Sequence, residues 1–545
     1  MKQADPIIDS LMSPGAPFEV ARSGAFRVFK NAPQNIIQTL QRSRSFGDLD
    51  FIVAGNQRLT YAQFFDRADA LAGHLINDCH IQPGQSVAIC MQNSPEWMIG
   101  FVAIQLAGGV AVLVNSRGTG EVMKAAIDDA DTVLVLADQK RANTLSGAGL
   151  GIPVILNTDY ASDITAYKAP ERTSEDIAAM MFTSGTTGRA KAAALSHRAL
   201  VHGVMNTQMA MVAIFQKMAA DYGIEIETLR QQMPQSCSLL AFPLFHTSGC
   251  SAVFLTSMST GGKLVLMDRW DGSKALELIE KERVSTFGGV PAMYWDMFDS
   301  PDYDKRDLSS LKALSCGGQA LPLNLQKEIK TRFPQGFIGA GYGMTEMSGA
   351  VSQANGAAFL ANPEASGQIL PMTDVKIVDE EGAELAQGEV GEIWTKGATM
   401  MSAYYGNPGE TAKAFADGWY KTGDVGRVDE NGYIYVVDRK TDMVISGGEN
   451  IYCAEVEQAL GKHPAVQAVT TFGVPDDRMG ERLVAAYQIA GNSISRDDLL
   501  AFAKANLAAY KVPTDIMIMG RPFELNAMGK VQKQKVRAKY LKGNG

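Results

Sequence analysis

Short apolar runs alternate with longer segments of helical period along most of the chain. Runs of four to eight apolar and β-branched residues predict buried strands, whereas apolar residues spaced three and four apart predict amphipathic helices. The helices predicted in this way include Tyr61–Asp78, Pro95–Leu106 and Ser273–Glu282. The predicted strands are Ser86–Cys90, Val110–Val114, Thr132–Leu136, Ala178–Phe182, Leu239–Pro243, Lys263–Met267 and Thr286–Val290. This alternation is typical of parallel sheets crossed by helices, so the pattern predicts an α/β fold.

The pattern changes after about Pro371 and again near Thr441. The stretches TDVKIVDEEG, GEVGEIWTKG and GYIYVVD alternate apolar with polar residues and are punctuated by Gly and Asp, which predicts an antiparallel β subdomain. A small α+β unit is predicted after it, from a helix, two strands and a second helix near Ala454–Leu460, Val466–Phe472, Leu483–Ile489 and Arg496–Asn506.

Composition narrows the class of protein. The chain has 545 residues, 46% hydrophobic and 20% charged, which is ordinary for a globular protein with more than one packed unit. Its net charge of −9 provides no basic face for nucleic acid. The six cysteines form no CxxC pair, so we expect reduced thiols rather than a disulfide framework or zinc site. The chain shows no signal-peptide core and no run of the ~18 apolar residues that span a membrane, so a soluble, cytoplasmic protein is expected.

The most informative short stretch is TSGTTGRAK, Thr183–Lys191, which follows a predicted strand. Its glycines allow backbone N–H groups to point inward, its hydroxyls add donors and Lys191 adds positive charge, a combination that can cradle phosphate. The order differs from the Walker A pattern GxxxxGK[ST], which excludes the usual P-loop interpretation. Clusters of Gly, Ser and Thr are also typical of plain turns, so the loop alone leaves both interpretations open.

Five further motifs accompany this loop, in the order FPLFHTSG (Phe242–Gly249), GYGMTE (Gly341–Glu346), YKTGDVG (Tyr420–Gly426), DRKTDMVISGGENIYCAEVE (Asp438–Glu457) and NAMGK (Asn526–Lys530). The ordered set resembles the adenylate-forming superfamily of acyl-CoA synthetases, peptide-synthetase adenylation domains and beetle luciferases. The resemblance covers nearly the whole chain. It implies a large N-terminal domain of packed αβα sheets with a β subdomain (1–438), a hinge (439–442) and a small mobile α+β domain (443–545).

The resemblance also implies roles for individual residues. Tyr342 is expected to lie against adenine, Asp424 and Arg439 to reach the ribose, and Thr345 to contact the α-phosphate. Glu346 is the expected Mg²⁺ ligand, since a carboxylate oxygen suits that hard ion. Without the resemblance, a helix-start carboxylate, a turn aspartate and a surface arginine would be the ordinary interpretations of Glu346, Asp424 and Arg439. The full set expected to bind ATP or CoA is Thr183, Ser184, Gly185, Thr186, Thr187, Gly188, Lys191, Gly318, Tyr342, Gly343, Asp424, Arg439 and Gly448, the last near the pantetheine of CoA.

Catalysis is expected from Lys530, Thr345, Glu346 and His246. A carboxylic acid is already ionised at pH 7, with an ordinary pKa near ~4, so its attack on the α-phosphate of ATP needs positioning and relief of charge repulsion rather than a base. The resemblance implies that Lys530 and Mg²⁺ supply this relief and that His246 lies at the acyl pocket. It also implies that the small domain rotates about the hinge before a thiol attacks the acyl-AMP. Taken alone, Lys530 could belong to a solvated basic tail and His246 to the core.

Three functional hypotheses follow. The first is an acyl-CoA synthetase that uses ATP, Mg²⁺, CoA and a small-molecule carboxylic acid. FPLFHTSG lacks the aspartate with which amino-acid-activating relatives hold the α-ammonium group of their substrate. We therefore expect a carboxylic acid without an amino group, either a fatty acid or an aryl acid. The second is an acyl-AMP ligase that loads an acyl carrier protein. The third is a binding homologue with a degraded site, because the sequence departs from the family pattern near Lys191, at Ala190 and Ala192, and just before NAMGK near Lys530. Thr441, in the hinge, and Cys453, expected to be a buried thiol, depart from the pattern as well. A homo-oligomer is left open, and the Met-rich segment 207–236 is expected either to pack on the core or to cover the acyl channel.

Overall fold

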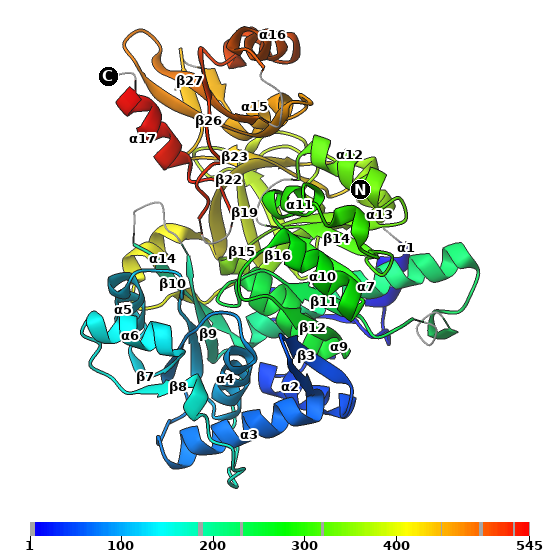
Figure 1. Cartoon of the computed structure of the whole chain (residues 1–545), viewed down its shortest axis with the longest axis vertical. Helices are drawn as coiled ribbons and strands as arrows, with labels where there is room; N and C mark the ends of the chain where they lie inside the picture. The colour runs from blue at the N-terminus through cyan, green and yellow to red at the C-terminus, as the bar shows by residue number, and fades with distance from the viewer. Residues whose placement is uncertain are drawn as a thin grey trace.

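A seven-stranded sheet with the order β20-β10-β9-β6-β5-β7-β8 forms one part of the protein. The structure is a computed structural model that describes residues 6–183, 189–228, 233–317, 321–447, 449–489, 494–526 and 529–543 (Figure 1). Five of the strands run parallel, whereas the two at one edge are antiparallel. The strands are β5 (Ser86–Cys90), β6 (Val110–Leu113), β7 (Thr132–Ala137), β8 (Val154–Leu156), β9 (Ile177–Thr183), β10 (Lys191–Ser196) and β20 (Ala403–Tyr404).

A nine-stranded sheet with the order β17-β16-β15-β14-β13-β11-β12-β3-β4 is the second large sheet of the protein. Its six central strands are parallel. The strands are β3 (Asp50–Ala54), β4 (Gln57–Thr60), β11 (Cys237–Leu240), β12 (Lys263–Leu266), β13 (Thr286–Gly289), β14 (Ala313–Cys316), β15 (Phe337–Met344), β16 (Gly349–Asn355) and β17 (Gln368–Ile369). An apolar cluster joins one face of this sheet to α10 (Gly272–Glu282), α11 (Pro291–Phe298), α12 (Leu323–Arg332) and α13 (Gly356–Ala361).

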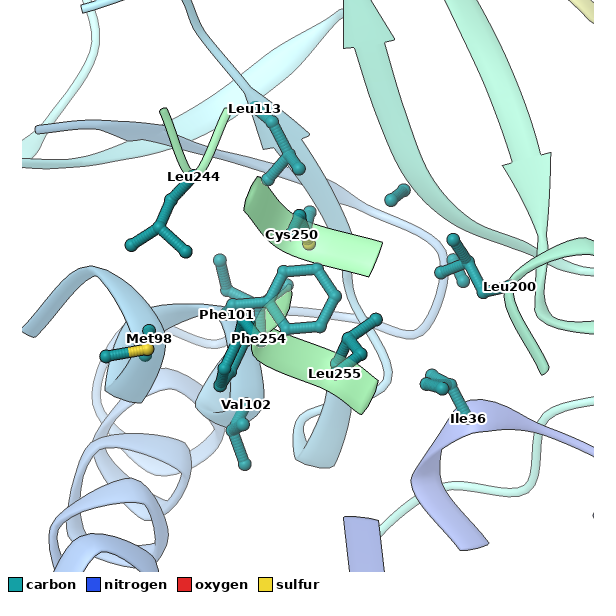
Figure 2. Packing of buried hydrophobic residues seen from close by; sticks show 14 of the residues in the cluster. Ile36, Met98, Phe101, Val102, Leu113, Leu200, Leu244, Cys250, Phe254 and Leu255 are labelled. Carbon is teal, nitrogen blue, oxygen red and sulfur yellow. The ribbon is translucent and has the colours of Figure 1, made fainter. Parts of the chain in front are cut away.

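The largest apolar core lies between the two sheets and includes α4 (Pro95–Leu106), in which every residue except Glu96 is buried. A helix that is apolar all round is stable only when surrounded, as here. Figure 2 shows Phe101 of α4 beside Phe254, and their rings meet edge to face with centroids 5.9 Å apart. The same layer contains α2 (Ile36–Ser43), α3 (Tyr61–Asn77), α7 (His197–Tyr222), η3 (Ser248–Leu255) and α9 (Thr256–Thr260). Two other helices, α5 (Gly120–Asp129) and α6 (Gln139–Gly147), cover the outer face of the seven-stranded sheet. The N-terminal part is therefore a stack of five layers.

Two five-stranded sheets follow toward the C-terminus. The first is antiparallel and contains β18 (Thr373–Val378), β19 (Gly391–Gly397), β21 (Phe415–Ala416), β22 (Trp419–Val428) and β23 (Ile434–Arg439). The second, at the top of Figure 1, contains β24 (Val444–Ser446), β25 (Glu449–Ile451), β26 (Val466–Asp476), β27 (Gly480–Ile489) and β28 (Asp515–Ile518). It packs with α15 (Cys453–Leu460), α16 (Arg496–Asn506) and α17 (Lys533–Gly543).

The α/β class predicted from the sequence is confirmed, and the helices at Pro95–Leu106 and Arg496–Asn506 have the predicted bounds. The strand predicted at Leu239–Pro243 was wrong in its bounds, because β11 ends at Leu240. Beyond that point Asn93 holds the chain: its amide donates to the Phe242 carbonyl (2.8 Å) and its carbonyl accepts from the Leu244 N–H (2.9 Å). In the described ranges, no helix is both long and apolar enough to cross a membrane.

All six cysteines fall in the described part of the chain and are free thiols, five of them buried. Burial raises the pKa of Cys237 to about 11 and the pKa of Cys90 to about 12. Burial likewise raises the pKa of Cys453 to about 12, and its Sγ donates to the Asp442 carbonyl (3.1 Å). Cys453 is thus the buried thiol that its sequence position predicted.

Candidate active site

The end of β15 lies beside β22 and β23, and this brings Tyr342, Asp424 and Arg439 together. Asp424 and Arg439 are partners in the β22–β23 register. The Tyr342 hydroxyl donates to Asp424 Oδ2 (2.6 Å), and Arg439 Nε lies 3.2 Å from Asp424 Oδ1. Burial raises the pKa of Asp424, although the Arg439 charge and the Tyr342 hydrogen bond act in the opposite direction. The three residues predicted to hold adenosine therefore form one contact network.

Immediately after β15, the short helix η5 (Thr345–Met347) buries both Thr345 and Glu346. The Tyr404 hydroxyl donates to Glu346 Oε1 (2.9 Å) and lies 3.2 Å from the Tyr420 hydroxyl. Burial and the Glu346 charge raise the pKa of both tyrosines, so both stay neutral near pH 7 and can act as donors. This arrangement fixes a carboxylate at the edge of the site. Neither tyrosine was predicted from the sequence, although Tyr420 stands at the start of the YKTGD motif.

The strands β9 and β10, which precede and follow residues 184–188, hold Lys191 in a defined place. Thr183, the last residue of β9, is the register partner of Lys191, the first of β10. The Lys191 ammonium forms an ion pair with Glu410, in α14 (Pro408–Ala414), and lies 5.1 Å from the centroid of the Tyr404 ring. Glu410 was not predicted from the sequence, because it lies 219 residues from its partner in the chain.

Lys530 reaches the site from the C-terminal end of the chain. Its backbone N–H donates to Asn526 Oδ1 (3.0 Å), and the Lys530 carbonyl accepts from the Asn526 N–H (2.8 Å). The neighbouring Gly529 has φ +76°, and a Cβ there would lie 2.7 Å from Val290 Cγ2, so this loop touches the start of α11. Burial and the Arg439 charge lower the pKa of Lys530, with Asp424 acting in the opposite direction. The Lys530 ammonium therefore interacts electrostatically with both Asp424 and Arg439.

His246 follows β11 and lies close enough to Lys530 for the lysine charge to affect the imidazole. Burial lowers the pKa of His246 to about 4, and the Lys530 charge acts in the same direction. The imidazole is thus neutral at pH 7. It can accept or donate a hydrogen bond to a polar group of a substrate without adding positive charge to the site.

One continuous cavity of about 3010 Å³ connects these groups. Its walls include every described residue of the predicted site, namely Thr183, Lys191, His246, Tyr342, Gly343, Thr345, Glu346, Asp424, Arg439 and Lys530. The remaining predicted residues, Ser184, Gly185, Thr186, Thr187, Gly188, Gly318 and Gly448, lie outside the described residues. The cavity is several times larger than a typical ligand pocket, so it has room for more than one substrate.

The residues present fit a magnesium nucleotide better than a metal held by protein alone. Among the residues that the structure describes, no group of three or more His, Cys, Asp or Glu side chains could hold a metal ion. Magnesium usually keeps several waters and binds one or two carboxylates together with substrate phosphates. Glu346 is a single buried carboxylate of that kind. At Gly343 a Cβ would meet the Gly349 carbonyl at 2.2 Å, so the backbone beside Tyr342 stays free of side chain.

Comparison with known families defines the class of the protein. Residues 40–405 match the AMP-binding enzyme family, and residues 455–530 match the AMP-binding enzyme C-terminal domain. The first match covers more than half of the chain, which therefore belongs to the AMP-binding enzyme family. The adenylate-forming family inferred from the motifs is confirmed.

Individual relatives are more specific. A feruloyl-CoA synthase of Amycolatopsis sp is 34% identical over 505 residues, which are 92% of this chain and 98% of that protein. A 3-[(3aS,4S,7aS)-7a-methyl-1,5-dioxo-octahydro-1H-inden-4-yl]propanoyl:CoA ligase of Rhodococcus jostii is 31% identical over 539 residues, 93% of this chain and 98% of that one. Among solved structures, o-succinylbenzoate coenzyme A synthetase of Bacillus subtilis with ATP and magnesium is 27% identical and has a TM-score of 0.77, covering 92% of this chain and 98% of that chain. The same synthetase has been solved with its acyl-adenylate intermediate (TM-score 0.77, 26% identity, 93% of this chain and 98% of that chain).

Proposed function

We propose that the protein is an ATP-dependent, AMP-forming carboxylic acid–CoA ligase. In the first half-reaction the acid attacks the α-phosphate of ATP to give acyl-AMP and pyrophosphate, and in the second the thiol of CoA attacks the acyl carbonyl and AMP leaves. The observation that carries the proposal is that Lys191, His246, Glu346, Asp424 and Lys530, spread over most of the chain, line one cavity. The named relatives are CoA ligases, which supports CoA as the acceptor.

The chain's own residues would do the following work in the first half-reaction. Asp424 accepts hydrogen bonds from the ribose, and Tyr342 lies against the adenine. Lys530 lies between the carboxylate and the α-phosphate, where its positive charge offsets the repulsion between two anions. Glu346, held by Tyr404, would bind the magnesium that accompanies ATP, and that ion would neutralise phosphate charge.

For the second half-reaction we propose that the C-terminal unit, 443–545, turns about a hinge at 439–442. β23 ends at Arg439 and β24 begins at Val444, so the hinge is the short connection between two sheets. At its start, Lys440 Nζ lies 3.3 Å from Glu392 Oε2, an exposed contact that can break at little cost. Rotation would carry Lys530 out and bring the ISGGEN segment toward the cavity.

The test is acid-dependent pyrophosphate release from ATP across aryl and fatty acids, each with and without CoA. Continuous release with CoA, together with acyl-CoA formation, is the expected result. Lys530→Ala, which removes only the ammonium-bearing chain, should abolish release. A burst of one pyrophosphate per enzyme that CoA does not extend would contradict CoA as acceptor and favour a carrier protein. No release with any acid would contradict the ligase itself.

A further inference from the structure

The central strands of the nine-stranded sheet leave part of one face open to the cavity. Along β13 and β14 the exposure alternates: Phe287 and Leu314 are buried against the outer helices, whereas Thr286 and Ser315 are half-buried and line the cavity. Ser238 of β11 is the register partner of Thr286 and has the same exposure. An uncovered stretch in the middle of a sheet is unusual, because such faces normally carry an apolar layer.

The open face has a reaction end and a distal end. Val290, which directly follows β13, touches the Lys530 loop at Gly529, so the C-terminal end of β13 faces the reacting groups. Thr286 lies four residues earlier, about 13 Å away at the ordinary rise of a strand. Ser238 is beside Thr286, and Ser315 is the partner of Gly288, between the two ends. The face therefore offers one hydroxyl midway and two at the distal end.

Near the reaction end an aromatic ring lies beside two glycines of the cavity wall. A Cβ on Gly288 would lie 3.4 Å from the ring of Phe242, and one on Gly317 would lie 3.8 Å from it. The Phe242 ring thus covers two positions without side chains. A flat apolar surface next to glycines accommodates a ring more readily than side chains that close around a single alkyl chain.

The three hydroxyls on this face have no side-chain hydrogen bond to another described residue, and all three border the cavity. Water can satisfy them while the cavity is open. A straight alkyl chain would displace that water and leave the hydroxyls unpaired, which is unfavourable. An acid with its own oxygen substituents would replace the water with new hydrogen bonds.

We propose that the acyl cavity is built for a ring-containing carboxylic acid that carries hydroxyl or carbonyl oxygens on the end far from the carboxylate. The inference rests on the proposed function, because it takes the acid to be the substrate of this cavity. Thr286 and Ser238 contact the distal oxygen, and Ser315 contacts the body of the acid. Unsubstituted alkyl acids are poor substrates.

The test compares matched acids by calorimetric binding and by kcat/KM for AMP formation. In the first pair, 4-hydroxy-3-methoxycinnamic acid is the oxygenated member and cinnamic acid is its analogue. In the second pair, a bicyclic keto propanoic acid is compared with its deoxygenated analogue. Dodecanoic acid is the alkyl probe. In at least one pair the oxygenated member should bind at least tenfold more tightly than its analogue and than dodecanoic acid, since a site built around hydroxyls rejects analogues that cannot pair with them.

Variants then assign the preference to residues. Thr286→Val keeps the shape and removes the hydroxyl, so it should lower the preference about tenfold and leave binding of the deoxygenated acid unchanged. Ser238→Ala and Ser315→Ala are the second and third variants. Thr331→Val makes the same change on the exposed side of α12, where the hydroxyl donates to the Lys327 carbonyl (2.9 Å), and should change nothing.

The inference is overturned if dodecanoic acid binds as tightly as the oxygenated ring acids, or if none of the three variants lowers the preference. Turnover of dodecanoic acid alone would overturn it and leave the ligase proposal intact. Selective binding of an oxygenated acid without AMP formation would contradict the proposed function and support the assignment of the cavity.

Discussion

At the scale of single residues, the Lys191–Glu410 ion pair has a chemical consequence for nucleotide binding. Lys191 is proposed to bind the phosphates of ATP, yet here its ammonium is matched with a carboxylate. Glu410 also pairs with Lys413 (2.8 Å), and these two lysines lower its pKa to about 2. The carboxylate is therefore charged at any pH of interest. It competes with phosphate for Lys191, which would favour release of pyrophosphate.

We expect Glu410→Gln to tighten pyrophosphate binding by roughly three- to tenfold, because Lys191 then lacks a competing anion. Calorimetric titration of the protein with magnesium pyrophosphate measures this directly, without turnover. Lys413→Gln is the matched control, since Lys413 contacts the same carboxylate but does not touch Lys191. Weaker binding in Glu410→Gln would mean instead that Glu410 is needed to hold Lys191 in position.

The residues of the site that could be predicted are those within recognisable motifs. Asp424, Arg439 and Lys530 were found because each stands in a short stretch of characteristic order. Glu410 and Tyr404 were not predicted, because their importance lies in their contacts with Lys191 and Glu346, which are far away in the chain. Such partners depend on how the sheets pack, which a linear pattern does not encode.

At the scale of elements, α7 carries two buried histidines on one side of the core. Ser196 caps the helix by accepting from the Ala199 N–H, and Gly223 ends it at φ +64°. His197 Nδ1 accepts from the Ile36 N–H (3.4 Å), and the ring of His202 stacks on Phe29. Burial is the main cause that lowers the pKa of each histidine to about 4. Both are thus neutral in the folded protein at pH 7.

Because of these two histidines, we expect the free energy of unfolding to fall as the pH drops from about 6.5 to about 4. In this window the unfolded chain binds protons on both side chains and the folded protein does not, so acid favours unfolding, by up to about 1.4 kcal/mol per pH unit for each histidine. Urea denaturation at pH 7.5, 6 and 4.5 measures the slope. His202→Phe should reduce it by about one proton, whereas the exposed His80→Asn should not. An unchanged slope in His202→Phe would assign the acid sensitivity elsewhere.

The boundaries of a helix or strand could be predicted where the residues that set them are neighbours in the sequence. They were harder to predict where those residues are far away in the chain. Ser94 and Pro95 define the start of α4, and the helix has its predicted bounds. The end of β11 depends on Asn93, which lies almost 150 residues before it in the chain. The Met-rich segment follows both expectations in part, since Met209 is fully buried in the core while Met211 and Phe215 line the cavity.

At the scale of the whole molecule, the contact between Gly529 and Val290 joins the last loop of the chain to the nine-stranded sheet. The sequence indicated three regions through changes of texture near Pro371 and Thr441, and the structure has sheets that change at these places. Which surfaces of the three regions contact one another could not be predicted from the sequence. The approach of the Lys530 loop to α11 became visible only in three dimensions, because it depends on the absence of a side chain at Gly529.

Gly529→Ala should therefore impair the first half-reaction selectively. A methyl group would collide with Val290 and sit in a left-handed conformation, so Lys530 would be held away from the cavity. We expect acid-dependent ATP–pyrophosphate exchange to fall at least tenfold, with thioester formation from supplied acyl-AMP retained. Gly520→Ala, where a Cβ meets nothing within 4 Å, is the control, and Val290→Ala should partly restore exchange to Gly529→Ala. Equal loss of both half-reactions would indicate a general folding defect.

The buried cysteines have a meaning for an enzyme proposed to handle a free thiol. Thiol–disulfide exchange requires an accessible thiolate, and such a thiolate would attack a sulfur of CoA disulfide, form a mixed disulfide and release CoA as the thiolate. Five of the six sulfurs are enclosed, and even the half-buried Cys79 has its pKa raised by burial. We therefore expect mixed disulfides with CoA to form slowly, even at Cys237 and Cys316, which border the cavity. This resistance would come from the burial of the sulfurs and the raised pKa of their thiols.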